Sequence, residues 1–566
     1  MPSPAQLAAR DMAAVFDAYQ QGVRDTARRA ARHFAEHDWV AARADSTDRL
    51  TLYGAKVNEV IARVDAVLGA GASVGDWAAV REAYAAEVDG RDDREIAETF
   101  FSSASRLRFT TVGVDESIEF HRPWTPLDDD EGNDAVTRWC AGDAGVDELA
   151  GALLAGGPRP LAREARDRAR VARALAAAAV AEWGDARLDG AEVLDAVFYR
   201  NREAYLVGCL RRGGRSLPLV VAFRSHDDGI AADAVLTTAD EASIVFGFAW
   251  SYLHADLPRP RATVAFLHRI MPLKRVDELY TAIGYNKHGK TELYSVLMHE
   301  LSSGGARFEE AEGTRGLVMS VFTLPSLNVV LKVIKDRISA PKTTTRTEVE
   351  RQYRRVFLND RVGRLADAQL FKGLAFPASC FPGALLAELS AVAPTVVRRE
   401  GARVVVNHLY TERRVRPLNL YVQEVSETEA VAAILDYGDA IRELAASNIF
   451  PGDLLLKNFG VSRHGRVIFY DYDELATLAE CSFRRIPPPR SFEDELSAEP
   501  WFSVSERDVF PEEFLRYMVP PGTLRDAFLD AHRDLLDADW WADMQERAAA
   551  GLAPDTFPYA TSRRLV

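Results

Sequence analysis

One short stretch of the chain combines residue types that could transfer a phosphoryl group. Residues 452–473 read GDLLLKNFGVSRHGRVIFYDYD and contain Asp453, Asn458 and Asp471. An aspartate on a loop can orient a hydroxyl nucleophile, and an asparagine and a second aspartate at facing ends of a hairpin can share the Mg²⁺ that bridges nucleotide phosphates. Lys457 could neutralise the charge that builds up on the transferred group. The stretch therefore predicts phosphoryl transfer from ATP to a hydroxyl.

The same pattern occurs in protein kinases, where H-R-D-L-x-x-x-N is followed by D-F-G. Here Asp453 opens D-L-L-L-K-N, and DYD at 471–473 stands where D-F-G would be. The sequence departs from the kinase pattern at 451–452, where Pro-Gly replaces His-Arg, and at Asp473, which replaces glycine. D-L-x-x-x-N alone could equally be a chance pattern in a surface hairpin. The second aspartate and a nucleotide loop upstream favour the kinase interpretation.

A glycine-containing loop upstream could bind the phosphates of the nucleotide. It consists of Ala311, Glu312, Gly313, Thr314, Arg315, Gly316 and Leu317. The two glycines let the backbone fold over phosphates, and the arginine adds positive charge. Lys332 in VVLKVIK matches the strand lysine that binds the α- and β-phosphates, and Lys335 is the competing candidate. Residues three apart on a strand point to opposite faces, so only one of these lysines can face the cleft.

A second string fits a different phosphate-binding pattern. Residues 284–291 read GYNKHGKT, which matches G-x-x-x-x-G-K-[ST] letter for letter. That loop must follow a buried strand, whereas the preceding VDELYTAIG has helical character, and no second element of this nucleotide site follows. We therefore expect ATP to bind at Lys332 and not at Lys290.

The elements around these residues follow the order of a two-lobed kinase. LVMSVFTL and LNVVLKVI predict a pair of strands, 347–357 a helix and 403–410 a strand. Ser426 and Glu429 form a capping box that begins a helix ending near Ser447. LKNFGV and RVIFYD then predict a small hairpin.

The first half of the chain predicts mostly helix. Residues 161–183 are rich in alanine, leucine and arginine and contain no glycine or proline. The acidic run at 128–134 and GGPRP at 156–160 are expected to be surface loops. The predicted fold class is α+β, with a mostly helical domain at 1–308 and a bilobal protein-kinase-like domain at 309–566.

Composition limits the classes of function. A chain of 566 residues predicts more than one domain, and 48% hydrophobic with 27% charged residues is ordinary for a globular protein. The formal net charge of −15 argues against a nucleic-acid partner. No segment approaches the roughly 20 apolar residues of a membrane span, and the N-terminus does not read as a secretory signal. The four scattered cysteines add to the expectation of a cytoplasmic protein.

Several long strings of the sequence resemble the isocitrate dehydrogenase kinase/phosphatase family, a family of bifunctional bacterial regulators. The likeness runs through nearly the whole chain and includes FYRNREAYLVG, TTADEASIVFGFAWSY, NIFPGDLLLKNFGVSRHGRVIFYDYDE and IPPPRSFEDELSAEPW. It implies a helical regulatory domain before a kinase-like domain. It also implies one site that phosphorylates a serine of isocitrate dehydrogenase and removes that phosphate, controlling flux between the citric acid cycle and the glyoxylate bypass.

The resemblance also implies roles for individual residues. It places ATP at the loop 311–317 and at Lys332, and it implies Asp453 as the kinase base. Asp473 corresponds to a residue needed for phosphatase action, and Asp367, within RVGRLAD, to an active-site aspartate. ATP and ADP are the implied nucleotides of the cleft, and AMP is the implied allosteric ligand between the domains.

Two other classes of function stay open at this point. A small-molecule kinase also uses D-x-x-x-x-N with a later aspartate, but it needs neither a large helical domain nor a segment like 486–514. A nucleotide-binding pseudokinase that scaffolds partners would not need its three site residues intact. The Pro-rich, acidic and aromatic segment 486–514 is either a surface loop or a docking segment for a protein partner. Glu348 and Glu350 are the candidates for the helix glutamate that pairs with the strand lysine, and His464 is expected to be a turn residue.

Overall fold

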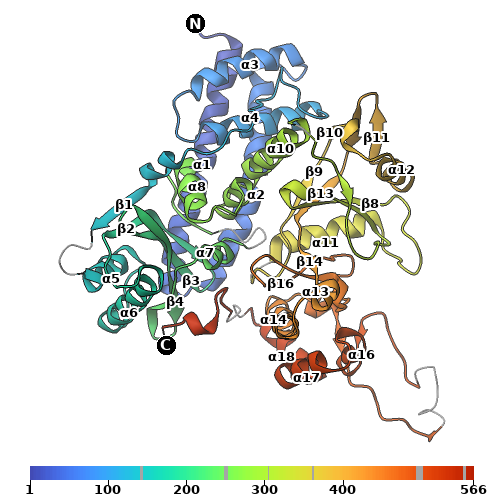
Figure 1. Ribbon diagram of the computed structural model, residues 1–566. Coiled ribbons are helices and arrows are strands. Elements are labelled where there is room, and N and C mark those ends of the chain that lie inside the picture. The colour runs from blue at the N-terminus through green and yellow to red at the C-terminus, as the bar shows by residue number, and fades with distance from the viewer. Residues whose placement is uncertain are drawn as a thin grey trace.

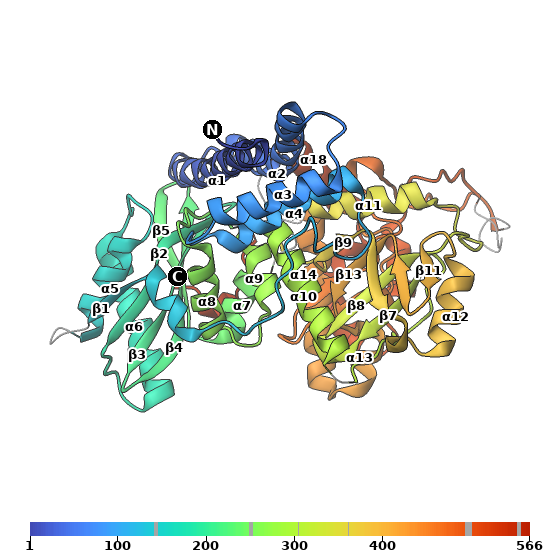
Figure 2. The same cartoon turned by 90° about the horizontal axis from the view of Figure 1, so that it is seen from above.

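The computed structural model describes residues 1–140, 145–247, 253–303, 305–359, 362–492, 501–551 and 556–565. The first half of the chain lies beside the second half, and both views show them in contact along one side (Figures 1 and 2). The fold is α+β, as the sequence predicts. None of the described helices is both long enough and apolar enough to cross a membrane.

Four helices begin the chain and pack on one another. They are α1 (Pro4–Glu36), α2 (Trp39–Leu68), α3 (Val74–Glu87) and α4 (Arg94–Phe109). Ser3 and Ser73 each form a capping box that satisfies the first backbone N–H groups of α1 and α3. Phe16, Trp77 and Phe100 are fully buried where the helices meet.

A five-stranded antiparallel sheet follows, which the prediction of a mostly helical first half did not include. Its strands are β1 (Val136–Cys140), β2 (Gly190–Arg200), β3 (Glu203–Arg212), β4 (Arg215–His226) and β5 (Gly229–Leu236), in that order. α5 (Gly145–Gly156) and α6 (Glu164–Trp183) pack against one face, and the other face joins the core of the first helices. Strands covered on both faces lose the alternation of apolar and polar residues that identifies them in a sequence.

Four helices lie between this sheet and the second half of the chain (Figure 2). They are α7 (Ala239–Val245), α8 (Pro260–Ile270), α9 (Val276–Ala282) and α10 (Asn286–Ser302). The string at 284–291 runs from the end of α9 into the first turns of α10, so a helix precedes it, as expected. It does not have the strand–loop–helix form of a nucleotide site.

The N-terminal lobe of the second half is an antiparallel sheet with one large helix. The strand order is β6-β7-β8-β13-β9. The bounds are β6 (Glu309–Glu310), β7 (Met319–Leu324), β8 (Val329–Ile334), α11 (Arg346–Asn359), β9 (Ala368–Phe371) and β13 (Leu409–Arg413). The predicted strand pair and helix are confirmed.

The single strand predicted at 403–410 is wrong, because this segment contributes to two sheets. β12 (Arg403–Val406) pairs with β10 (Leu374–Pro377) and β11 (Val397–Glu400), next to α12 (Gly383–Val392). β13 begins at Leu409 and pairs with β8 and β9. The chain changes sheets at Asn407 and His408. Apolar residues stand on both sides of this point, in β12 and in β13, so the sequence reads as one strand.

The C-terminal lobe is mostly helical and contains the predicted hairpin. Its main elements are β14 (Arg416–Pro417), α13 (Leu418–Glu424), α14 (Glu427–Ala446), β15 (Phe459–Val461), β16 (Val467–Phe469), β17 (Ser482–Phe483), β18 (Asp508–Val509), α16 (Phe514–Met518), α17 (Thr523–His532) and α18 (Ala538–Ala549). The capping box of Ser426 and Glu429 begins α14, as predicted.

The C-terminal tail returns to the first half of the chain (Figure 1). The Tyr559 hydroxyl donates to Asp233 Oδ2 at 2.6 Å, and the Leu565 N–H donates to the Asp233 carbonyl at 2.6 Å. Asp233 lies on β5, so the end of the chain is bound to the edge of the first sheet.

Candidate active site

Lys332 on β8 faces the interior between the two lobes. Its side chain is 7% exposed, and Nζ lies 2.8 Å from Glu412 Oε2 and donates to the Tyr470 carbonyl at 2.8 Å. Lys335 instead donates to the Gly316 carbonyl at the surface. The strand therefore turns Lys332 inward and Lys335 outward, as their spacing predicts.

The expectation that a glutamate of α11 pairs with Lys332 is wrong. Glu348 bonds to Arg351, and Glu350 Oε1 lies 3.5 Å from His408 Nε2. The partner is Glu412, which lies on β13 beside β8. Tyr410 is directly opposite Lys332 in the register, and side chains two residues apart on a strand share a face, so Glu412 reaches the lysine. No local pattern in the sequence indicates this pair, because it depends on which strands are neighbours.

The loop that carries Asp453 has a backbone that requires glycine. Gly452 has φ +81°, and a Cβ at this position would lie 2.3 Å from the Glu474 carbonyl oxygen. This explains why glycine stands where kinases have arginine. The Asp453 carboxylate accepts from the Leu455 N–H at 3.0 Å, and the Tyr437 hydroxyl on α14 donates to the Leu454 carbonyl. The loop is thus fixed to the helix before it.

The hairpin of β15 and β16 brings Asn458 and Asp471 to neighbouring positions, as predicted. Phe459 pairs with Phe469, and the Tyr470 N–H donates to the Asn458 carbonyl at 3.1 Å. The Asn458 side-chain amide donates to the Asp453 carbonyl at 3.3 Å. The three polar residues predicted for phosphoryl transfer therefore meet at one end of the hairpin.

The carboxylates of this group repel one another. Burial raises the pKa of Asp471, and the nearby Asp453 raises it further, while Lys332 and Lys342 oppose the shift. Burial also raises the pKa of Asp473, with Asp471 as the second cause. A site with so much negative charge favours a cation. Lys342, whose Nζ lies 2.6 Å from Glu474 Oε1, is a basic residue of the site that sequence reasoning missed.

Asn458 and Asp471 suit Mg²⁺, which prefers oxygen ligands. Among the described residues, no group of three or more His, Cys, Asp or Glu side chains is placed to hold a metal ion. A magnesium ion here would thus complete its coordination with nucleotide phosphates and water, the usual arrangement in kinases. Lys457 is exposed beside Asn458, and its carbonyl accepts from the Tyr470 hydroxyl.

The loop 311–317 connects β6 and β7, and it lies beside the segment that joins the lobes. Gly313 has φ +108°, a conformation that favours glycine, and a Cβ there would lie 3.7 Å from Pro417. Glu312 bonds to Arg416. Arg315 lies 2.9 Å from Glu310 and 3.4 Å from Glu388 of α12, and its side chain is 73% exposed, so these two carboxylates bind the guanidinium at the surface.

Asp367 does not join the other predicted site residues. It lies just before β9, and Gln369 donates to its carboxylate at 3.2 Å. Gln369 pairs with Thr411, and Thr411 pairs with Leu331, so these side chains lie on the face of the sheet opposite Lys332. Whether Asp367 takes part in the chemistry stays a prediction.

The surroundings of Asp367 come from both halves of the chain. It lines a cavity of about 100 Å³ together with Lys274, Glu278 and Arg413. Burial raises the pKa of Asp367 to about 7. His464, expected to be a turn residue, lines the same cavity, and its Nδ1 lies 2.9 Å from Asp240 Oδ1. The tip of the hairpin of β15 and β16 thus contacts α7 of the first half.

The segment 486–514 is described only in part. Residues 493–500 lie outside the described part of the chain. The Ile486 N–H donates to Glu512 Oε2 at 3.0 Å, so the two ends of the segment are joined, and the Trp501 indole N–H donates to the Pro487 carbonyl at 3.1 Å. Its use as a docking segment stays a prediction.

A two-lobed α+β fold, a strand lysine paired with a buried glutamate, and an Asp–Asn–Asp group on a hairpin define a protein-kinase-like phosphotransferase. Residues 306–561 match the family model for the kinase domain of isocitrate dehydrogenase kinase/phosphatase (AceK), and residues 9–305 match that for its regulatory domain. The chain belongs to the isocitrate dehydrogenase kinase/phosphatase family.

Full-length relatives carry the same name. A protein of Anaeromyxobacter sp. (strain Fw109-5) named isocitrate dehydrogenase kinase/phosphatase is 47% identical over 572 residues, which cover 100% of this chain and 99% of the relative. A protein of that name from Xanthomonas campestris pv. campestris (strain 8004) is 40% identical over 582 residues, with the same coverage of both chains. The chain is therefore an enzyme of this kinase/phosphatase class.

Proposed function

We propose that the protein uses Mg-ATP to phosphorylate a serine of isocitrate dehydrogenase and removes that phosphate in the same cleft. The observation that carries the proposal is the meeting of Asp453, Asn458 and Asp471 opposite Lys332, in a chain of this family. The name of the relatives supplies the substrate. The reaction would set flux between the citric acid cycle and the glyoxylate bypass, in the cytoplasm. A small-molecule kinase is not favoured, because the relatives match over their full length.

In the kinase direction, each residue acts on a different part of the transfer. Asp453 orients the serine hydroxyl and accepts its proton as the serine oxygen attacks the γ-phosphorus, and the bond from that phosphorus to ADP breaks. Lys332, held by Glu412, binds the α- and β-phosphates. Asn458 and Asp471 would hold Mg²⁺, which neutralises phosphate charge when bound. Lys457, beside Asn458, could neutralise the charge that builds up on the transferred phosphoryl group.

In the phosphatase direction, water replaces the serine hydroxyl as the nucleophile. Asp473 lies in the turn that follows Asp471, and its backbone hydrogen-bonds to the Asp471 carboxylate, so the two acidic residues lie close together. One can hold the metal ion while the other orients a water molecule toward a bound phosphoserine. Burial and Asp471 raise the pKa of Asp473, which brings this carboxylate closer to the range of a general base.

We also propose AMP as an allosteric ligand between the two halves. A cavity of about 1060 Å³ lies there, and its lining includes the basic residues Arg106, Lys287, Lys290 and Lys372. Burial and neighbouring cations hold the pKa of Lys290 well below its ordinary value. An anionic phosphate in the cavity would favour the charged lysine. The string at 284–291 thus supplies residues to this cavity.

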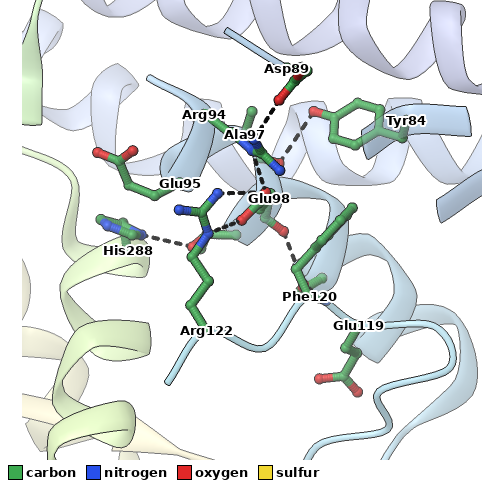
Figure 3. A network of polar contacts seen from close by, with 12 residues as sticks. Tyr84, Asp89, Arg94, Glu95, Ala97, Glu98, Glu119, Phe120, Arg122 and His288 are labelled. Carbon is green, nitrogen blue, oxygen red and sulfur yellow. Dashed lines mark hydrogen bonds and ion pairs between the residues drawn. The ribbon is translucent and has the colours of Figure 1, made fainter. Parts of the chain in front are cut away.

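Helix α4 forms one wall of the cavity and is held by polar contacts (Figure 3). Arg94 and Arg122 both bond to Glu98, and the Thr99 hydroxyl lies 2.8 Å from His288 Nδ1 on α10. Ser102 accepts from the Phe120 N–H at 2.9 Å. These contacts fix α4 against α10 and against the loop that follows α4, so the cavity has a defined shape before a ligand binds.

The proposed function is tested by following labelled phosphate in both directions. Purified protein, γ-labelled Mg-ATP and isocitrate dehydrogenase are mixed, and label is measured on the dehydrogenase. The labelled dehydrogenase is then isolated and returned to the enzyme with unlabelled nucleotide and AMP, and free phosphate is measured. Label that enters and leaves the dehydrogenase supports the proposal. Label on small molecules with none on the dehydrogenase would contradict it.

A further inference from the structure

Helix α11 brings one buried tyrosine to the ion pair of Lys332. Tyr353 is 1% exposed, and its hydroxyl lies 3.2 Å from Glu412 Oε1 and 3.3 Å from Met319 Sδ. A carboxylate oxygen is a much stronger acceptor than a thioether sulfur, so the hydroxyl donates mainly to Glu412. The other carboxylate oxygen, Oε2, lies 2.8 Å from Lys332 Nζ. One carboxylate thus joins a helix hydroxyl to the lysine of the nucleotide site.

This arrangement differs from that of protein kinases, in which a glutamate of the corresponding helix pairs directly with the strand lysine. Here the glutamate comes from β13, and the helix contributes a neutral donor. The position of α11 can still affect Lys332, because Tyr353 moves with the helix and Glu412 lies between them.

The ring of Tyr353 also contacts the segment that carries the two aspartates. It stacks on Tyr410 with ring centroids 3.9 Å apart, and it meets Tyr472 edge to face at 5.1 Å. Tyr472 stands between Asp471 and Asp473, and its hydroxyl donates to the Ala366 carbonyl at 2.6 Å. A single side chain therefore contacts the elements on both sides of the cleft.

We propose that Tyr353 is the positioning residue that takes the place of the missing helix glutamate, and that its hydroxyl orients Glu412 so that Lys332 meets the phosphates of ATP. The proposal rests on the proposed function of the cleft as a nucleotide site. Without the hydroxyl, the buried Glu412 carboxylate loses a hydrogen-bond donor, and the geometry of its ion pair with Lys332 becomes less well defined. A hydrogen bond to a buried charged group is worth about a factor of ten in an equilibrium constant.

The test is calorimetry of Mg-ATP binding to the full-length protein. Tyr353→Phe keeps both ring contacts and removes only the hydroxyl, so we expect its Kd to rise about tenfold. Tyr84→Phe is the matched control, because Tyr84 is equally buried and its hydroxyl donates to the Ala97 carbonyl far from the cleft (Figure 3). It should bind Mg-ATP like the wild type. A Tyr353→Phe protein that binds as tightly as the Tyr84→Phe protein would overturn the proposal.

A double variant separates a positioning role from general packing. If Tyr353 acts through Lys332, Tyr353→Phe should weaken binding no further in a protein that already carries Lys332→Met. A further tenfold loss in the double variant would contradict the proposal.

Lys332→Met alone tests the nucleotide site: normal Mg-ATP binding by that variant would refute the proposed function itself. If Tyr353→Phe does not fold, Glu412→Gln, which keeps the side-chain shape, is measured in its place, and its Kd for Mg-ATP should rise at least about tenfold; an unchanged Kd would overturn the proposal.

Discussion

Replacing Asp367 by asparagine should stabilise the protein at neutral pH and much less in acid. Burial raises the pKa of this carboxyl from 3.8 to about 7. A group whose pKa is raised on folding supports the folded state below its unfolded pKa, and this support is lost as the pH rises through the folded pKa. Asparagine resembles the protonated acid and does not titrate. The variant should therefore gain stability over the wild type as the pH rises from about 4 to about 7.

The expected gain in the free energy of unfolding follows from the size of the pKa shift of Asp367. About 3 pKa units correspond to at most about 4 kcal/mol at pH 8, of which about 2 to 3 kcal/mol should appear between pH 5 and pH 8. The assay is urea unfolding of wild type and Asp367→Asn at both pH values, followed by tryptophan fluorescence. An asparagine variant that is less stable than the wild type by the same amount at both pH values would show that folding does not raise the pKa of Asp367. Kinase assays of the same variant decide whether Asp367 also takes part in the chemistry, as the family resemblance implies.

Two further variants test the nucleotide site and the separation of the two activities. Lys332→Met should weaken Mg-ATP binding tenfold or more, and Lys290→Met should change it little, since Lys290 lies outside the cleft; calorimetry showing the reverse order would exclude the kinase-like site. Asp473→Ala should lose dephosphorylation while it keeps most kinase activity, because the serine hydroxyl replaces water in that direction. Assays with phosphorylated and unphosphorylated dehydrogenase check this, and a parallel loss of both activities would rule out a water-positioning role.

Much of the site could be predicted because its residues lie close together in the sequence. Asp453, Asn458 and Asp471 belong to one loop and one hairpin, so local spacing determines their geometry. The orientation of Lys332 followed from strand alternation. The capping box at Ser426 correctly identified the start of α14, since such a cap needs only residues three apart.

The parts of the fold and of the site that could not be predicted depend on contacts between segments that are far apart in the chain. Glu412 meets Lys332 because β13 lies beside β8, and a helix glutamate was the wrong expectation. The first sheet was missed because both faces of its strands are covered. The motif around Asp367 did not tell on which face of β9 the carboxylate lies, and that face is set by the register with Thr411.

We propose that Asp453 serves as the base of a protein kinase directed at isocitrate dehydrogenase. The most direct measurement is the initial rate of label transfer from γ-labelled Mg-ATP to the dehydrogenase by wild type and by Asp453→Asn, with Mg-ATP affinity measured in parallel. We predict a loss of about 10²- to 10⁴-fold in rate with little change in affinity. Near-normal transfer by the asparagine variant would exclude Asp453 as the base.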